Sequence, residues 1–86
     1  MSDLNQLRLE INEITSQMVE LFEKRLDVSK EVAAYKKANN LPIYQPEREK
    51  QVIEMYTKDA KYPELTKMFL ESLMTLSKEL QKEENK

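Results

Sequence analysis

The stretch VELFEKRLDVSKEVAAYK, residues 19–36, decides the fold, because it continues an apolar series but interrupts it with a charge. The series advances by three or four residues at a time, which is the spacing of an amphipathic α-helix. One more step from Leu21 reaches Arg25, where the pattern requires an apolar side chain. The apolar members are Leu4, Leu7, Ile11, Ile14, Met18, Leu21, Val28, Val32 and Tyr35.

Outward from this stretch, the pattern predicts one long helix from about Leu4 to Ala38. Asp3 or Ser2 is suited to cap its first turn. We expect the helix to end at residues 39–40, because asparagine tolerates left-handed backbone geometry and Pro42 follows.

Two shorter helices are expected downstream. Pro46 fits the first position of a helix that runs to about residue 58. A turn around Pro63 precedes a third helix from about residue 64 to about 82, and the final residues, KEENK, are expected to form a frayed, exposed tail. The chain is therefore predicted to be all-α, a single domain over residues 1–86.

The composition excludes several function classes. The 86 residues include no glycine, cysteine or histidine, which rules out a glycine-rich phosphate loop, a Cys/His zinc site and His-assisted nucleophilic catalysis. With 14 basic and 16 acidic residues the net charge is −2, so we expect no nucleic-acid partner. There is no apolar run long enough for a membrane span and no cysteine framework. We expect a soluble cytoplasmic protein without a cofactor or metal.

The length of the first helix predicts a partner chain. Its 35 residues would form a rod of roughly 50 Å, whereas a compact domain of this size has a radius of gyration of roughly 12 Å. Two shorter helices of the same chain are insufficient to cover an apolar stripe of that length. We therefore predict a helical homodimer in which the long helix of a second chain covers the stripe.

Polar residues interrupt the apolar faces at one end of the predicted bundle. Arg25 and Lys36 are eleven residues apart, hence about 20° apart around the helix and roughly 16 Å along it, so that both can lean toward one pocket. In the third helix the series Leu70, Met74, Ser77 and Gln81 begins apolar and ends polar. Arg48 and Glu49 open the second helix nearby.

Each of these residues also has a structural interpretation. Arg25 can set the register of a dimer, or its stem can reach water. Lys36 can complement the helix dipole, and Ser77, Gln81, Arg48 and Glu49 can be ordinary surface residues. Their joint occurrence favours a binding site, because several cations in one apolar-walled space are costly without an anion.

Arg8 lies 17 residues before Arg25, roughly 25 Å away along the rod. It cannot reach the same ligand within one chain. In an antiparallel pair of long helices, however, Arg8 of the second chain would lie over residues 25–36 of the first. The predicted dimer would then complete the site.

Four segments in order resemble the small all-helical chorismate mutases of the AroQ class: LNQLRLEINEI, LFEKRLDVSKEVAAYK, LPIYQPERE and LMTLSKELQ. The resemblance covers nearly the whole chain. It implies an intertwined three-helix dimer with two sites, an isomerase of aromatic amino acid biosynthesis that converts chorismate to prephenate. This reaction is a unimolecular Claisen-type rearrangement, which needs no nucleophile, metal or proton transfer.

The resemblance also implies residue roles, carried over by position. Lys36 and Gln81 would donate to the ether oxygen of the breaking bond, and Arg25 with Arg8 of the partner chain would hold the two carboxylates. Arg48 and Ser77 would support the carboxylate side and Glu49 would meet the ring hydroxyl. Gln45 stands where some members have an acidic residue, so a backbone contact and a side-chain contact both remain open.

Two rival functions remain at this point. Isochorismate pyruvate lyases of the same family use a similar dicarboxylate pocket. A helical dimerisation or regulatory module without catalysis would explain the long apolar stripe equally well. Binding of dicarboxylate analogues separates the module from both enzymes, and the product separates the two enzymes.

Overall fold

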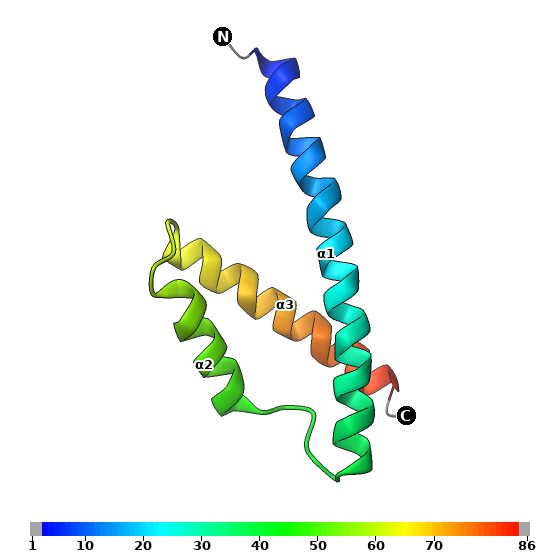
Figure 1. The fold of residues 1–86 in the computed structure, drawn as a ribbon. Helices are drawn as coiled ribbons and strands as arrows, with labels where there is room; N and C mark the ends of the chain where they lie inside the picture. The colour runs from blue at the N-terminus through cyan, green and yellow to red at the C-terminus, as the bar shows by residue number, and fades with distance from the viewer. Residues whose placement is uncertain (1–2, 85–86) are drawn as a thin grey trace.

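The computed structural model describes residues 3–84, which form three helices and no strand: α1 (Leu4–Ala38), α2 (Pro46–Thr57) and α3 (Pro63–Glu84) (Figure 1). The predicted all-α class is confirmed. The carboxylate of Asp3 caps α1 by accepting the backbone N–H of Gln6 at 2.8 Å. Ser2, the alternative cap, lies outside the described residues.

The end of α1 is a left-handed cap. Asn40 has a φ of 56°, as expected from the paired asparagines. The N–H of Leu41 donates to the carbonyl of Lys36 at 2.8 Å and the N–H of Asn40 to that of Lys37 at 3.4 Å. These two bonds form a Schellman motif, which reverses the chain immediately after the helix.

The shorter helices begin at prolines. Pro46 occupies the first turn of α2 as predicted, and α3 begins at Pro63 itself, one residue before the predicted start. The prediction of a frayed tail is wrong for residues 82–84, because α3 continues to Glu84, whose carboxylate lies 4.0 Å from the ammonium of Lys30 on α1. Residues 82–84 are exposed as expected, and residues 85–86 of the predicted tail lie outside the described residues.

Helix α3 holds the fold together, because it packs against both α1 and α2. It crosses the C-terminal half of α1, while the N-terminal half of α1 projects beyond the other two helices (Figure 1). The resulting body measures 56 × 25 × 14 Å with a radius of gyration of 16.2 Å. A compact domain of this length would have a radius of roughly 12 Å.

Very little of this chain is buried. Three apolar residues, Ala33, Leu70 and Met74, are buried among residues 3–84. Most of the α1 stripe faces outward, with Leu4 and Ile11 each 60% exposed. Within a single chain the apolar stripe of α1 therefore stays largely exposed, as the length of this helix predicts. No helix within residues 3–84 combines the length and the apolar character that crossing a membrane requires.

Candidate active site

Four polar side chains form one hydrogen-bonded chain where α1 and α3 cross. The hydroxyls of Ser29 and Ser77 are 2.8 Å apart, and Nε2 of Gln81 donates to the Ser77 hydroxyl at 3.3 Å. Nζ of Lys36 donates to Oε1 of Gln81 at 3.0 Å. Ser29, Ser77 and Gln81 are all buried, with 6–8% of their surface exposed. Buried polar groups need such partners, and the network fixes how the two helices meet.

Lys36 is held from two sides. Besides Gln81, its Nζ donates to the carbonyl of Ile43 at 2.8 Å, which the reversal after α1 brings back toward the helix. Burial lowers the pKa of the Lys36 ammonium below its ordinary 10.5, and the nearby Glu49 carboxylate partly offsets this. Lys36 is thus a partly desolvated cation whose position is fixed by neutral acceptors.

A cavity of about 490 Å³ lies beside this network. Arg25 from α1 and Arg48 from α2 line it together with Ser29 and Ser77. Both arginines are exposed, and no ion pair within residues 3–84 includes either of them. Two guanidinium groups without a carboxylate partner at a polar cavity are suited to bind an anion, because the planar fork matches a carboxylate. The other lining residues are Lys24, Val28 and Val32.

The sequence predicts that Arg25 and Lys36 lean toward one pocket, but the two residues do not line the same cavity. Arg25 lines the cavity, but Lys36 does not. The Lys36 ammonium turns toward α3 and the loop after α1. Hydrogen bonds from Lys36 to Gln81 and from Gln81 to Ser77 connect it with the cavity wall.

Glu49 and Gln45 lie at the start of α2. The Glu49 carboxylate pairs with the ammonium of Lys78 at 3.1 Å, and both side chains are about one quarter exposed. Gln45 is half-buried at the cap position of α2 without a side-chain cap bond, and its carbonyl accepts the N–H of Glu49 at 3.1 Å. This bond belongs to the first turn of α2, and the choice between a backbone and a side-chain contact of Gln45 with a ligand stays a prediction.

Arg8 is not brought to the other candidate residues. It is exposed on the projecting half of α1, and the helix is continuous from Leu4 to Ala38. The separation of roughly 25 Å from Arg25 that follows from helix geometry therefore stands. Seven of the eight candidate residues lie on the C-terminal half of α1, at the start of α2 or on the C-terminal half of α3. Arg8 alone lies on the projecting half of α1.

Four participants are not among the predicted site residues: Ser29, Tyr44, Lys78 and the Ile43 carbonyl. Ser29 follows Arg25 by four residues, so helical periodicity was sufficient to place it on the same face. Tyr44 and Lys78 meet only in the folded chain, with the Lys78 ammonium 4.4 Å from the centre of the Tyr44 ring. The paired asparagines predict the reversal after α1, but they do not predict that it brings the Ile43 carbonyl to Lys36.

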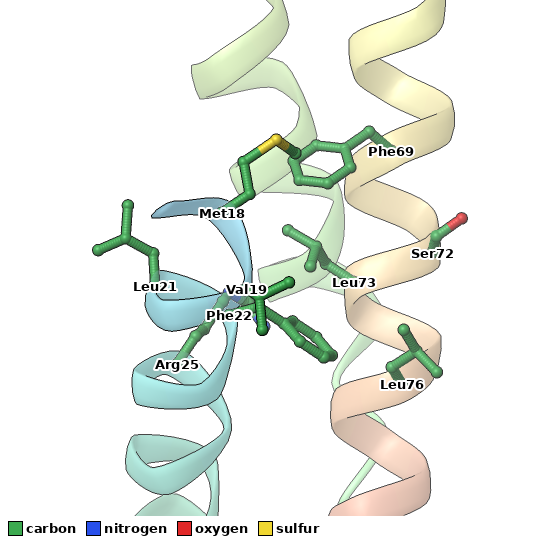
Figure 2. Close-up of a pocket in the computed structure, with 9 residues that line it drawn as sticks. All are labelled: Met18, Val19, Leu21, Phe22, Arg25, Phe69, Ser72, Leu73 and Leu76. Carbon is green, nitrogen blue, oxygen red and sulfur yellow. The ribbon is translucent and has the colours of Figure 1, made fainter. Parts of the chain in front are cut away.

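A larger cavity, of about 530 Å³, separates α1 from α3 further toward the N-terminus (Figure 2). Figure 2 shows Met18 and Phe69 reaching toward each other from the two helices. Arg25 is the only charged residue among those that line it, so the cavity is suited to apolar side chains rather than to a polar ligand. The remaining lining residues are Val19, Leu21, Phe22, Ser72, Leu73 and Leu76.

The polar site combines two functions that anion chemistry needs. Two guanidinium groups can orient a carboxylate-bearing ligand, and a desolvated ammonium with an adjacent amide can stabilise negative charge that develops during a reaction. No group of three or more potential His, Cys, Asp or Glu metal ligands forms within residues 3–84.

Comparison with known proteins gives a consistent result. Residues 7–82 match the family described as chorismate mutase type II. The chain is 43% identical over 49 residues to the T-protein of Haemophilus influenzae, covering 57% of this chain and 13% of that protein. It is 37% identical over 54 residues to a bifunctional chorismate mutase/prephenate dehydratase of Aquifex aeolicus, covering 63% of this chain and 15% of that protein. The matches therefore span only a small part of these relatives. No solved structure matches the chain significantly.

Proposed function

The chain belongs to the chorismate mutase type II family, and we propose that it rearranges chorismate to prephenate as a homodimer with two sites. The observation that carries this proposal is the hydrogen-bonded pair of the half-buried Lys36 and the buried Gln81, next to a cavity lined by two unpaired arginines. The absence of glycine, cysteine and histidine agrees with a reaction that needs no covalent or metal catalysis.

In the proposed mechanism Arg25 and Arg48 hold one end of the dianionic substrate in the cavity. The bidentate grip of a guanidinium group fixes the carboxylate in orientation, which selects the compact conformer that reacts. Ser77 adds a neutral hydrogen bond at the same wall. Binding energy is thus used to restrict a flexible molecule to its reactive shape.

Lys36 and Gln81 act on the bond that breaks. Negative charge grows on the ether oxygen as its bond to carbon lengthens, and an ammonium and an amide N–H at that oxygen bind the transition state more tightly than the substrate. Contacts with Ile43 and Gln81 hold the ammonium in one position before the substrate binds, which supports this role. One such donor is worth about 3 to 4 kcal/mol in the barrier.

The second chain completes the site in this proposal. An exposed apolar stripe along α1 and the apolar cavity between α1 and α3 offer surface for another long helix. An antiparallel α1 of the partner would bring the partner's Arg8 over the cavity and supply a guanidinium group for the second carboxylate. A cytoplasmic location of this dimer is part of the proposal, and a chain without cysteines is compatible with that reducing compartment.

Product analysis tests the proposal directly. Purified protein is offered chorismate and, separately, isochorismate, and prephenate and pyruvate are both quantified. Prephenate from chorismate supports the mutase. Pyruvate from isochorismate as the main product would assign the lyase activity instead, and failure of either compound or a dicarboxylate analogue to bind would leave a dimerisation module.

A further inference from the structure

Lys78 has no role in the proposed mechanism, yet it makes specific contacts at the site. Its ammonium lies 3.1 Å from Oε2 of Glu49 and donates to Oε1 at 3.3 Å, so that it engages both carboxylate oxygens. The same ammonium sits 4.4 Å from the centre of the Tyr44 ring, a cation–π distance. Lys78 thus joins α3 to the start of α2 and to the loop before it.

Glu49 interacts with two ammonium groups. It pairs with Lys78, and its charge also acts on Lys36, whose ammonium it stabilises. Lys36 itself forms no ion pair within residues 3–84 and donates only to the neutral oxygens of Ile43 and Gln81. Glu49 therefore acts on Lys36 through its charge, whereas its direct contact is with Lys78.

This arrangement matters because a carboxylate is a stronger partner for an ammonium than a neutral oxygen is. If Glu49 turned to Lys36, it would occupy the donors that the reaction needs and would cancel the charge that stabilises the ether oxygen. Contact with Lys78 supplies the counter-charge for Glu49 elsewhere, and the Tyr44 ring fixes where that counter-charge lies.

We propose that Lys78 is a positioning residue, which holds the Glu49 carboxylate away from Lys36 so that the Lys36 ammonium remains available to the substrate. This inference rests on the proposed function. In this role Lys78 does not contact the substrate. It acts through Glu49, and only on the step in which Lys36 stabilises developing charge.

The test compares Lys78→Met with Lys82→Met, a matched control one turn further along α3, where an exposed lysine pairs weakly with Glu79 at 3.9 Å. We expect Lys78→Met to lower kcat about tenfold with little change in KM, because the lost stabilisation belongs to the transition state. Lys78→Arg should retain most of the turnover, since it keeps a cation at Glu49. Lys82→Met should behave as the unaltered protein.

A double-substitution cycle separates the indirect role from a direct one. In a Glu49→Gln background, Lys78→Met should have no further effect on kcat, because the carboxylate it restrains is gone. An equal loss of kcat in both backgrounds, or a raised KM with unchanged kcat, would overturn the proposal and assign Lys78 a contact with the substrate. Unchanged kinetics in Lys78→Met would remove any role.

A second measurement does not depend on turnover. Four groups face Lys36 or its neighbours: the Ile43 carbonyl, Glu49 from α2, Gln81 from α3, and Lys78 beyond Glu49. In Lys78→Met the pKa of Lys36, followed by NMR of its side-chain nitrogen, should rise, because Glu49 turns toward it. An unchanged or lower Lys36 pKa contradicts the positioning role. If the unaltered protein fails to convert chorismate, the proposed function is wrong, and this titration still decides the arrangement around Glu49.

Discussion

Nζ of Lys36 on α1 lies 3.0 Å from Oε1 of Gln81 on α3, a contact between two residues that are 45 positions apart in the chain. Because the amide oxygen accepts from the ammonium, the amide nitrogen is directed to Ser77. One hydrogen bond thus orients two donors at once. We expect turnover to depend on that preorganised pair and on the arginines beside it.

Lys36→Ala should reduce kcat by about a hundredfold to a thousandfold, the effect of removing one donor from developing negative charge. Lys37→Ala, an exposed neighbour on the same helix, is the matched control. Chorismate consumption followed by absorbance measures both. Retention of near-normal kcat in Lys36→Ala would exclude it as the main electrostatic catalyst.

Arg25→Ala should abolish turnover while helicity and dimerisation persist, because Arg25 is exposed at the cavity and forms no ion pair within the described chain. Arg25→Lys should recover only part of the activity, since an ammonium cannot grip a carboxylate with two parallel bonds. Circular dichroism and analytical ultracentrifugation accompany the assay, with Lys30→Ala as control. Dissociation of the dimer in Arg25→Ala would support the register-setting interpretation.

Mixed dimers test whether sites are shared between chains. A protein carrying Arg8→Ala and one carrying Lys36→Ala should each be nearly inactive. Co-folded heterodimers should regain up to one functional site, because one of the two sites then receives both unaltered residues. A verified heterodimer with no recovered activity contradicts the antiparallel arrangement.

The pH profile should be flat through neutrality and fall on the alkaline side. Gln81 is neutral at every pH, so no protonated carboxyl is required. Burial lowers the pKa of Lys36 below 10.5, so the active ammonium is lost at a lower pH than an ordinary lysine would lose it. A steep decline of kcat between about pH 6 and 8 would contradict this assignment, because a group titrating near neutrality would then be essential.

Ser29→Ala should lower the free energy of unfolding by about 1 kcal/mol, the net worth of one buried hydrogen bond. The loss is limited because the Ser77 hydroxyl keeps its bond from Gln81. Thermal unfolding of Ser29→Ala and of Lys37→Ala, an exposed lysine of the same helix, at equal protein concentration measures the difference. A change no larger than that of the control would show that the Ser29 contact contributes nothing to stability.

Periodicity was sufficient to predict the helices and one buried face. The series Leu70, Met74, Ser77 and Gln81 includes every residue of α3 that is buried. The Asn40 cap was also predictable, because a left-handed residue after a helix favours glycine or asparagine, and the chain has no glycine. Local rules therefore fixed the helices and the buried face of α3.

The remaining features depend on how the helices pack. Lys78 follows Ser77 in sequence and looks like a surface residue, and only the position of α2 brings Glu49 and Tyr44 to it. The third helix continues beyond its predicted end because Glu84 lies within reach of Lys30 on α1. Pairings of this kind join residues 29 to 54 positions apart, which helical periodicity cannot specify.

Three of the six buried residues in the described chain are polar. Half of the buried positions of a lone subunit are thus polar, and only three apolar side chains remain to drive its collapse. Folding and association then become one thermodynamic event for the proposed dimer, so its melting temperature should climb as the protein is concentrated. On this view, dilution alone would erase both structure and catalysis together.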